Sequence, residues 1–495
     1  MGVYRKLTMV SAAVLGFAAV AADLPPYLDD SDDRVWTPLN VPFKRIGTLK
    51  PRRASEIKDS NWTLGCEGLD RWGDFKTFRE YIDPLGIKTI RLQAGWAKCE
   101  KEKGKYDFAW LDDIIDYAVT NGINVLLETD YGNTIYEGGG GPWLGSPFPT
   151  SEVAVVAWDN WVDALSKRYR GKVRDWAMWN EPDISIELFP GMRRQIERKS
   201  PESIAAQNVR TARIIRRNIP DARIGALSLA QNSPEFLEKC LVAMGEDVKL
   251  FEWVIYHGYV FNPDVSYADV EKQKEILKKY MPHARMRQGE NGCNSGWVPT
   301  SALSSYPWSE FSQAKWDLRR MLGDLGHDIP SSVFCLHGGG DGKSLLRMVK
   351  NKVIDMKIAY YAVQNVASVF DDSLERIGED TRIKPDFQQI DPTVATYEYR
   401  KRDGRRLYVL WEQGDLKKFN KKTNKQCPSD SFVWRPISFI TRKELKEPVW
   451  VDLITGAVYE FPAKYVRDCG GLWHFRLLPV YDSPILLTER SVVLP

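Results

Sequence analysis

Apolar positions along the first three quarters of the chain follow two patterns that take turns. Short apolar runs with the length of a β-strand, such as 88–93 and 124–129, are separated by longer segments such as 110–121, in which apolar residues recur every three or four positions. The second spacing places apolar side chains on one face of a helix. This part of the chain is therefore predicted to consist of strands that alternate with amphipathic helices.

The alternation can be counted as eight strand-and-helix units. Strands joined by helices run parallel, and eight such units fit a closed (β/α)8 barrel better than an open, doubly wound sheet, which remains the alternative. Two of the strands are expected to end at Cys66 and Glu181, and the others to cover 88–93, 124–129, 222–229, 252–259, 284–290 and 332–337. The helices are expected near 74–83 and at 110–121, 152–169, 202–218, 234–244 and 268–280.

The pattern changes after about Asp371. Strand-like runs with alternating apolar residues, such as 406–411 and 449–453, are now separated by turns and no longer by helices. This arrangement is typical of antiparallel sheets. The chain is therefore expected to contain a barrel at 59–370 and an antiparallel β domain at 371–495.

The N-terminal segment has the features of a signal peptide. Arg5 and Lys6 precede an apolar run over 7–20, and small residues lead to a cleavage site after residue 22. We expect residues 1–22 to direct export to the periplasm or the exterior and to be removed. Residues 23–58 are predicted to form a linker or N-terminal extension. No later apolar run reaches about 18 residues, so the mature protein is expected to be soluble, with no membrane span.

Charge and composition narrow the class of partner. The 69 Lys and Arg residues are interspersed with 66 acidic residues, giving a net charge of +3, which argues against a nucleic-acid partner. The 18 tryptophans offer aromatic faces of the kind that stack on sugar rings. Seven cysteines are too few, and odd in number, for a disulfide scaffold, although one or two bridges are allowed, and their spacing suits no zinc site. A carbohydrate is the ligand that this composition favours, and the oligomeric state is left open.

Two carboxylates stand where a barrel carries its chemistry, at the ends of strands. Glu181 lies in a Trp-Asn-Glu-Pro tetrad that ends the fourth strand, where Pro182 is expected to stop the sheet and to favour an extended backbone at Glu181. Glu290 ends the seventh strand, three units later, so the two side chains are expected to face one another across the barrel. Facing carboxylates are what glycoside hydrolysis requires. Glu67 and Glu128, near the ends of the first and third strands, remain competitors for the second position.

The tetrad and its surroundings resemble the acid/base strand of the clan A glycoside hydrolases, most closely family 39 and its relatives, over roughly residues 60–370. The resemblance implies a retaining enzyme on a (β/α)8 barrel. We expect the reaction to need no cofactor, and nothing visible in the sequence requires a metal. The resemblance assigns Glu181 as the acid/base and Glu290 as the nucleophile. It also implies that the C-terminal domain is a small β-sandwich, to which part of 35–58 would contribute an edge.

Further candidate residues surround this pair. Arg91, at the end of the second strand, is a plausible cation for Glu290, and Tyr259 is a plausible phenol donor to it, because a His-x-Tyr sequence matching His257 and Tyr259 does this work in the clan. Asn180 would bind the sugar 2-hydroxyl, a contact that strengthens in the transition state.

The eighth strand departs from the clan, which commonly ends it with a tryptophan under the sugar. Here the strand leads to His337 and three glycines, so His337 is expected to contact a hydroxyl, with Trp143 and Trp297 arriving from loops. The His-Gly-Gly-Gly sequence also mimics an esterase oxyanion loop, but the chain has no Gly-x-Ser-x-Gly elbow. The glycines at 138–141 lack the register of a nucleotide-binding loop and are interpreted as a mobile flap.

The resulting hypothesis is a retaining glycosidase that acts on polysaccharides or oligosaccharides by double displacement. Long loops after the third, fourth and seventh strands, at 130–150, 183–200 and 291–308, predict a walled pocket and exo action. An endo-acting glycanase, a transglycosylase with the same residues and a non-catalytic carbohydrate-binding barrel remain alternatives. Xylosides, arabinosides and galactosides all remain possible substrates.

Overall fold

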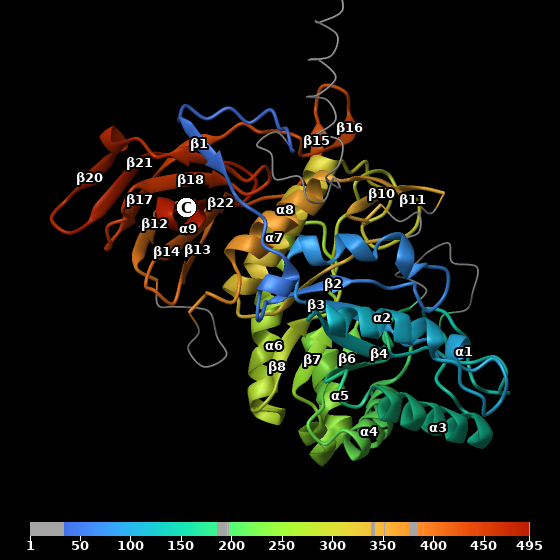
Figure 1. Ribbon diagram of the computed structural model, residues 1–495. Coiled ribbons are helices and arrows are strands. Elements are labelled where there is room, and N and C mark those ends of the chain that lie inside the picture. Colours follow the sequence, from blue (N-terminus) through green and yellow to red (C-terminus); the bar gives the residue numbers. More distant parts are fainter. Residues whose placement is uncertain are drawn as a thin grey trace, which may run out of the picture.

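The computed structural model describes residues 34–185, 196, 198–337, 342–350, 352–375, 385–389 and 391–494. A (β/α)8 barrel forms one part of the molecule and antiparallel sheets form the other (Figure 1). The expected signal peptide, 1–22, lies outside the described residues. Within them, no helix is both long enough and apolar enough to cross a membrane.

Eight parallel strands form the barrel in the order β8-β7-β6-β5-β4-β3-β2-β9. The two ends of this order meet where the backbone N–H of Gln288 donates to the carbonyl of Pro330 at 3.0 Å, so the sheet closes and the open-sheet alternative is wrong. The strands are β2 (Trp62–Gly65), β3 (Thr89–Gln93), β4 (Asn124–Thr129), β5 (Asp175–Met178), β6 (Arg223–Leu229), β7 (Trp253–Tyr256), β8 (Arg285–Gln288) and β9 (Ser331–Val333).

Helices follow the strands at nearly all the expected places. Ser151, Ser200, Ser233 and Ser309 each accept a backbone hydrogen bond from the first turn of a helix, which fixes where the helix starts. The main helices are α2 (Ala109–Thr120), α3 (Glu152–Tyr169), α4 (Pro201–Asn218), α5 (Pro234–Met244), α6 (Tyr267–Tyr280), α7 (Glu310–Gly326) and α8 (Ile358–Val369); α1 (Trp96–Cys99) is a single turn.

The helix expected near 74–83 is wrong. Three short 3-10 turns occupy this place, at Phe75–Thr77, Arg79–Tyr81 and Asp83–Leu85. Pro84 has no N–H to donate and Gly86 has a left-handed φ of 80°, so a continuous α-helix cannot run through the end of this segment.

Several barrel strands end earlier than the sequence predicts. The sixth ends at Tyr256, the seventh at Gln288 and the eighth at Val333, two to four residues before the expected ends. His257, Tyr259 and Glu290 therefore lie in the first residues of loops at the carboxyl face of the barrel.

The C-terminal part contains two larger antiparallel sheets. One has the order β1-β19-β18-β22-β14-β13 and the other β12-β17-β21-β20. The ring of Tyr408 on the first sheet lies 5.3 Å from that of Phe439 on the second. Nε1 of Trp450, also on the first sheet, donates to the carbonyl of Pro479 on the second at 2.9 Å. The two sheets therefore pack face to face as a sandwich. The strands are β12 (Phe387–Gln389), β13 (Val394–Arg400), β14 (Arg406–Glu412), β17 (Arg435–Thr441), β18 (Pro448–Asp452), β19 (Ala457–Glu460), β20 (Val466–Asp468), β21 (Trp473–Val480) and β22 (Ile485–Glu489), and Arg490–Val493 forms the short helix α9.

An early segment of the chain completes this sandwich. Strand β1 (Arg45–Thr48) pairs with β19 in antiparallel fashion, and Figure 1 shows it in blue beside the red strands of the C-terminal part. The segment 35–58 therefore contributes an edge strand, as the resemblance implied.

A buried arginine joins barrel and sandwich. Arg319 of α7 donates to Asp264 at 3.0 Å, to the carbonyls of Glu412 and Gly414 at 2.8 and 2.7 Å, and to that of Asp482 at 3.0 Å. A buried guanidinium with so many acceptors is held in one geometry. The two parts are therefore rigidly connected on the α7 side.

A small ribbon of the C-terminal part also reaches the barrel's carboxyl face. Strands β15 (Lys417–Asn420) and β16 (Lys425–Pro428) pair with each other, and the N–H of Lys418 donates to the hydroxyl of Tyr306 at 2.8 Å. Tyr306 also bonds the carbonyl of Cys427. The ribbon therefore supports the loop that follows β8, whereas the hairpin of β10 (Leu346–Val349) and β11 (Lys352–Met356) follows β9.

None of the seven cysteines takes part in a disulfide. Cys66, Cys99, Cys240, Cys293 and Cys335 are buried, whereas Cys427 and Cys469 have solvent access. The barrel is therefore held by packing and hydrogen bonds without disulfide support.

Candidate active site

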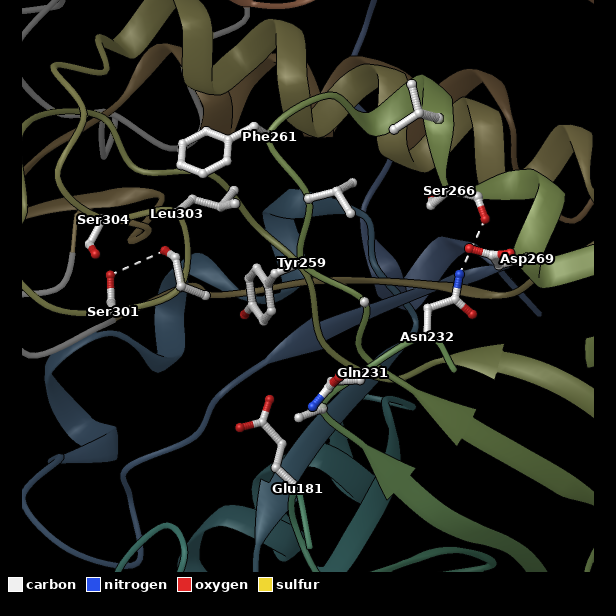
Figure 2. Close-up of a pocket in the computed structure, with 15 residues that line it drawn as sticks. Glu181, Gln231, Asn232, Tyr259, Phe261, Ser266, Asp269, Ser301, Leu303 and Ser304 are labelled. Atoms are coloured by element: carbon white, nitrogen blue, oxygen red, sulfur yellow. Dashed lines mark hydrogen bonds between the residues drawn. The ribbon is translucent and has the colours of Figure 1, made fainter. Parts of the chain in front are cut away.

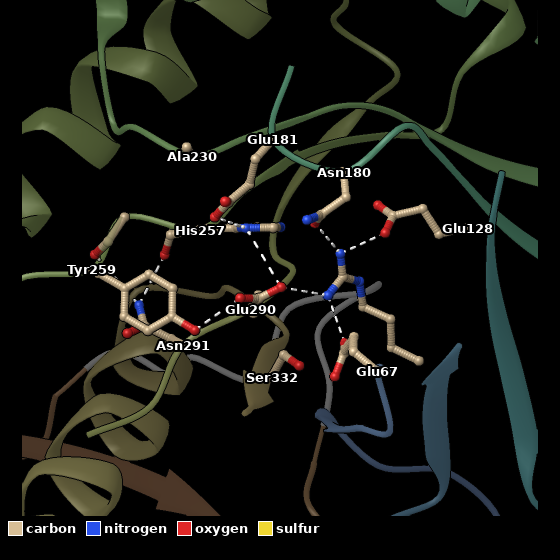
Figure 3. Close-up of polar contacts among 12 residues, drawn as sticks. Glu67, Glu128, Asn180, Glu181, Ala230, His257, Tyr259, Glu290, Asn291 and Ser332 are labelled. Carbon is tan, nitrogen blue, oxygen red and sulfur yellow. Dashed lines mark hydrogen bonds and ion pairs between the residues drawn. The ribbon is translucent and has the colours of Figure 1, made fainter. Parts of the chain in front are cut away.

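The candidate residues meet at the carboxyl ends of the barrel strands (Figure 3). Glu181 follows β5, His257 follows β7 and Glu290 follows β8, whereas Arg91 lies within β3. All four are buried, with the largest exposed fraction 9% at Glu290. Burial strengthens every charge interaction in the group.

The backbone at Glu181 is not extended, so the expectation drawn from Pro182 is wrong. Glu181 has a φ of 48° and Trp179 a φ of 25°, both in the left-handed region that non-glycine residues rarely adopt. The N–H of Glu181 donates to the carbonyl of Ser228 at 3.0 Å, and that of Trp179 to Thr129 at 3.1 Å. Contacts with both neighbouring strands thus hold a conformation that costs about 1–3 kcal/mol per residue and aims the carboxylate into the site.

Glu181 and Glu290 face each other with His257 between them. Nδ1 of His257 lies 2.8 Å from Oε1 of Glu181 and 3.8 Å from Oε2 of Glu290. A carboxylate oxygen of Glu181, a carboxylate oxygen of Glu290 and a ring nitrogen of His257 all lie within 4.8 Å of one another. Gly289 allows this approach, because a methyl group there would lie 2.4 Å from the side chain of Ile255.

Glu290 is surrounded by donors. Nη1 of Arg91 donates to Oε2 at 2.7 Å, and the hydroxyl of Tyr259 donates to Oε1 at 2.9 Å. Burial favours the protonated carboxyl, but the charges of His257 and Arg91 and the hydrogen bonds from Arg91 and Tyr259 outweigh it and lower the pKa of Glu290. Glu290 is therefore kept ionised, as a nucleophile must be.

Glu181 has the opposite environment. Burial raises the pKa of Glu181, and the negative charge of Glu290 adds to this, while His257 opposes it. Burial alone would lower the pKa of His257, but the charges of Glu290 and Glu181 raise it. The two carboxyls are thus driven apart in pKa, which is the arrangement that pairs an acid with a base.

Arg91 donates hydrogen bonds to the other polar side chains of the site. Its Nη1 also donates to Glu67 at 2.5 Å, and its Nη2 donates to Glu128 and to the amide oxygen of Asn180, both at 2.6 Å. The amide nitrogen of Asn180 donates in turn to the hydroxyl of Tyr131 at 2.7 Å. Glu67 and Glu128, the competitors for the nucleophile, therefore lie behind Arg91, and Glu290 is the carboxylate beside His257.

His337 is placed by stacking. Its ring is parallel to that of Phe78 at 4.9 Å and lies 5.4 Å from Trp72, which is 53% exposed. Burial lowers the pKa of His337. Sequence reasoning missed Trp72, an exposed aromatic residue in the loop after the first barrel strand, although its position after a strand end was a usable signal. A hydroxyl contact for His337 remains a prediction.

The two loop tryptophans remain predictions as sugar contacts. Trp297, in the loop after β8, is 64% exposed. Trp143 folds over Gly141, where a methyl group would lie 1.9 Å from the indole ring. The loop 130–150 is fastened by backbone hydrogen bonds, Gly132 to Gly141 at 3.1 Å and Asn133 to Gly139 at 2.9 Å, and its mobility as a flap is likewise still a prediction. Most of the expected wall at 183–200 lies outside the described residues.

A cavity of about 740 Å³ opens beside Glu181 (Figure 2). Its lining comes from the loops after β6, β7 and β8 and includes Gln231, Tyr259, Phe261 and Ser301, but not Glu290. The cavity therefore lies on the Glu181 side of the carboxylate pair. Sequence reasoning missed all of these lining residues except Glu181 and Tyr259, because nothing in their local sequence is distinctive.

Glu181, His257 and Glu290 form the only cluster in the described part of the chain with donor atoms close enough for a metal ion. The cluster does not fit a cation well. Nδ1 of His257 is already engaged with Glu181, and the fixed guanidinium of Arg91 lies 2.7 Å from Glu290, where it would repel a metal ion.

Sequence comparisons find relatives over short stretches of the chain. The model of a glycoside hydrolase family described as Beta-galactosidase matches residues 74–151. The beta-galactosidase BgaA of Clostridium cellulovorans is 37% identical over 51 residues, which are 10% of this chain and 8% of that protein. The match thus spans under a tenth of the curated relative.

Solved structures resemble nearly the whole chain. A family 39 glycoside hydrolase from Bacteroides cellulosilyticus superposes with a TM-score of 0.63 at 18% identity, covering 90% of this chain and 83% of that one. A monomeric beta-xylosidase from Caulobacter crescentus has a TM-score of 0.54 at 15% identity, covering 90% and 97%, and a family 39 enzyme from Xanthomonas axonopodis has 0.54 at 14%, covering 89% and 95%. The chain thus has the fold of the clan A glycoside hydrolases, and the resemblance stated from the sequence is confirmed.

Proposed function

We propose that this protein, with its clan A barrel, is a retaining glycosidase in which Glu290 is the nucleophile and Glu181 the acid/base. The observation that carries the proposal is the buried pair itself. The two carboxyls face one another, and their surroundings lower the pKa of Glu290 and raise that of Glu181. A nucleophile has to be ionised while the acid holds a proton, so each group is tuned to one role.

The spacing of the pair favours retention. Retaining glycosidases hold their carboxyl groups about 5 to 5.5 Å apart, whereas inverting enzymes leave about 6.5 to 9.5 Å for a water molecule. Here a carboxylate oxygen of Glu181 lies within 4.8 Å of one of Glu290. Direct attack by Glu290 on the sugar therefore fits the site better than attack by an interposed water.

The reaction follows in two balanced steps. Glu290 attacks the anomeric carbon, the glycosidic bond breaks, and Glu181 transfers its proton to the departing oxygen, leaving a glycosyl ester on Glu290. Water then attacks the same carbon, Glu181 takes the proton of that water, and the ester bond breaks to release the sugar. Arg91 and Tyr259 hold the Glu290 carboxylate in the orientation for attack.

The cavity beside Glu181 supports an assignment for the leaving group. A group that receives its proton from Glu181 has to depart on the Glu181 side, and the cavity of about 740 Å³ lies there. Sites for small ligands commonly have volumes of about 300 to 1,000 Å³. The cavity is therefore large enough for a sugar unit as the leaving group.

The glycone is proposed from the names of the relatives. The family description and the curated relative are beta-galactosidases, and one fold neighbour is a beta-xylosidase. Galactosides and xylosides are therefore the first substrates to test, with arabinosides next. Export through residues 1–22 and exo action belong to the same proposal and rest on sequence pattern and loop length.

A panel of aryl glycosides tests the function. Turnover of at least one sugar is expected, with loss of about a thousandfold or more in Glu290→Gln. Glu181→Gln should lose far more activity on poor leaving groups than on dinitrophenyl glycosides, which need little protonation. Glu246→Gln, at an exposed position, is the matched control.

Three results would reject parts of this assignment. Full turnover in both active-site variants would reject the residue roles. No turnover of any glycoside by the wild type would favour a non-catalytic carbohydrate-binding barrel. Loss of activity on addition of a chelator would contradict a mechanism without metal. Product analysis with added acceptor sugars separates hydrolysis from transglycosylation.

A further inference from the structure

One nitrogen of Arg91 is shared between the nucleophile and a second carboxylate. Nη1 donates to Oε2 of Glu290 at 2.7 Å and to Oε1 of Glu67 at 2.5 Å (Figure 3). Glu67 lies just beyond β2 and is 7% exposed. The two carboxylates therefore compete for the same N–H group.

The charge around Arg91 does not balance if every carboxyl is ionised. Glu67, Glu128 and Glu290 all accept from this one guanidinium, and all three are buried. Like charges this close inside a protein favour protonation of one member. The groups that face Glu67 are Arg91 of β3, Glu290 after β8 and, across the guanidinium, Glu128 of β4, with the Cys66 thiol adjacent in the chain.

Contacts favour Glu67 over Glu290 as the carboxyl on Nη1 of Arg91 that holds the proton. Glu290 accepts from the side chains of both Arg91 and Tyr259, whereas Arg91 is the only described side chain that donates to Glu67. Oε2 of Glu67 is buried and has no hydrogen-bond partner in the described part of the chain. The same holds for Oε1 of Glu128, but Glu128 bonds Nη2 of Arg91 and so does not compete with Glu290 for Nη1. A methyl group at Gly65 would lie 2.5 Å from Oε2 of Glu67, so Oε2 lies close beside the backbone of Gly65.

Electrostatics agree with the contacts. Burial raises the pKa of Glu67 to about 7, with a further contribution from the charge of Glu290 and an opposing one from Arg91. Burial and the neighbouring carboxylate thus act in the same direction as the missing partner of Oε2.

We propose that Glu67 is a positioning residue for the nucleophile, which in its protonated form leaves Nη1 of Arg91 to Glu290 and in its ionised form competes for it. The inference rests on the proposed function. Ionisation of Glu67 weakens the hydrogen bond that orients Glu290, so nucleophilic attack slows as pH rises through neutrality. Glu67 touches neither the sugar nor the leaving group in this account.

The test isolates the step in which Glu290 attacks. A dinitrophenyl 2-fluoroglycoside of the sugar identified by the panel traps the glycosyl ester on Glu290, and dinitrophenolate release gives the trapping rate with little need for acid from Glu181. In Glu67→Gln the side chain is neutral, like the protonated acid, but cannot ionise at any of these pH values. The trapping rate of this variant at acidic pH should be within about threefold of wild type, and it should fall about fivefold less than wild type between mildly acidic and mildly alkaline pH.

Glu128→Gln is the matched control. It removes the carboxylate on Nη2 of Arg91, which Glu290 does not share, so the fall in rate near neutral pH should persist. Superimposable pH profiles for wild type and Glu67→Gln would overturn the inference while leaving the proposed function intact. Failure of the wild type to form any adduct would overturn both.

An infrared measurement tests the proton directly and without turnover. Besides the carbonyl stretch of protonated Glu181, the wild type should show a second protonated-carboxyl component that disappears near neutral pH, and Glu67→Gln should lack this second component. Gly65→Ala keeps Glu67 but displaces its Oε2, and should shift the midpoint of this signal. A band that is unchanged in Glu67→Gln would reject Glu67 as the proton holder.

Discussion

His257 and Glu181 share a hydrogen bond of 2.8 Å, and the same imidazole nitrogen lies 3.8 Å from Glu290. One ring therefore faces both members of the carboxylate pair. The charge of His257 lowers the pKa of each carboxyl. His257 therefore influences both the acid and the alkaline limb of the expected dependence of kcat/KM on pH.

Replacing His257 should move both limbs upward. In His257→Gln the pKa of Glu290 and that of Glu181 both rise, because a positive neighbour is lost. The acid limb of kcat/KM, which follows ionisation of Glu290, and the alkaline limb, which follows loss of the Glu181 proton, should each shift to higher pH. A pH profile on an aryl glycoside measures this, and a downward shift of either limb would contradict the account.

Tyr259→Phe should reduce kcat by about ten- to a hundredfold, the usual value of a hydrogen bond to a charged group. The variant loses the donor that lies 2.9 Å from Glu290, and the pKa of Glu290 should rise. Tyr256→Phe is the matched control, because the Tyr256 hydroxyl is buried with no hydrogen-bond partner among the described residues. Steady-state kinetics should show a normal kcat for Tyr256→Phe, and an equal loss in both variants would contradict a specific role for Tyr259.

Gln231→Ala should weaken recognition of the leaving group. Gln231 lines the cavity beside Glu181, and loss of one neutral hydrogen bond is worth about 1 kcal/mol, or roughly fivefold in kcat/KM. The loss is expected for a disaccharide but not for a glycosyl fluoride, whose leaving group does not reach the cavity. Equal losses on the two substrates would place Gln231 outside the leaving-group site.

Exo action predicts a slow change in polymer length. If the loops at 130–150 and 291–308 help to close one end of the site, a long polysaccharide should release single sugars or short units while its viscosity falls slowly. Viscometry with product chromatography over the first minutes checks this. A rapid fall in viscosity with mixed oligosaccharides would indicate an open cleft.

The sequence predicted strands and helices correctly where interactions between residues close in the chain determine the structure. The periods of 2 and 3.6 residues identified most barrel elements, since a strand or helix has to bury one face. The local pattern gave a wrong prediction at 74–83, where Pro84 and Gly86 leave only 3-10 turns. It also placed the ends of β7 and β8 too late, because the residues that follow these strands are buried as well.

Part of the candidate site could also be predicted from the sequence. Glu181 stands in an unusual tetrad, and Glu290 was found by counting strands, which works because strands three units apart in a closed eight-stranded barrel lie across its mouth from one another. The sequence did not predict the contacts of His337 with Phe78 and Trp72, or the cavity beside Glu181. They depend on how loops from different units pack together.

By itself, then, the sequence determined which residues stand at strand ends, because each strand is specified by its own apolar pattern. Only the tertiary structure decided how these residues pair. The left-handed backbone of Glu181 is held by a hydrogen bond to Ser228 on the next strand, and Glu67 and Glu128 meet at one guanidinium because β3, which carries Arg91, pairs with β2 on one side and with β4 on the other. Such contacts join residues far apart in the chain, and their energies come from shared burial and charge that no local pattern records.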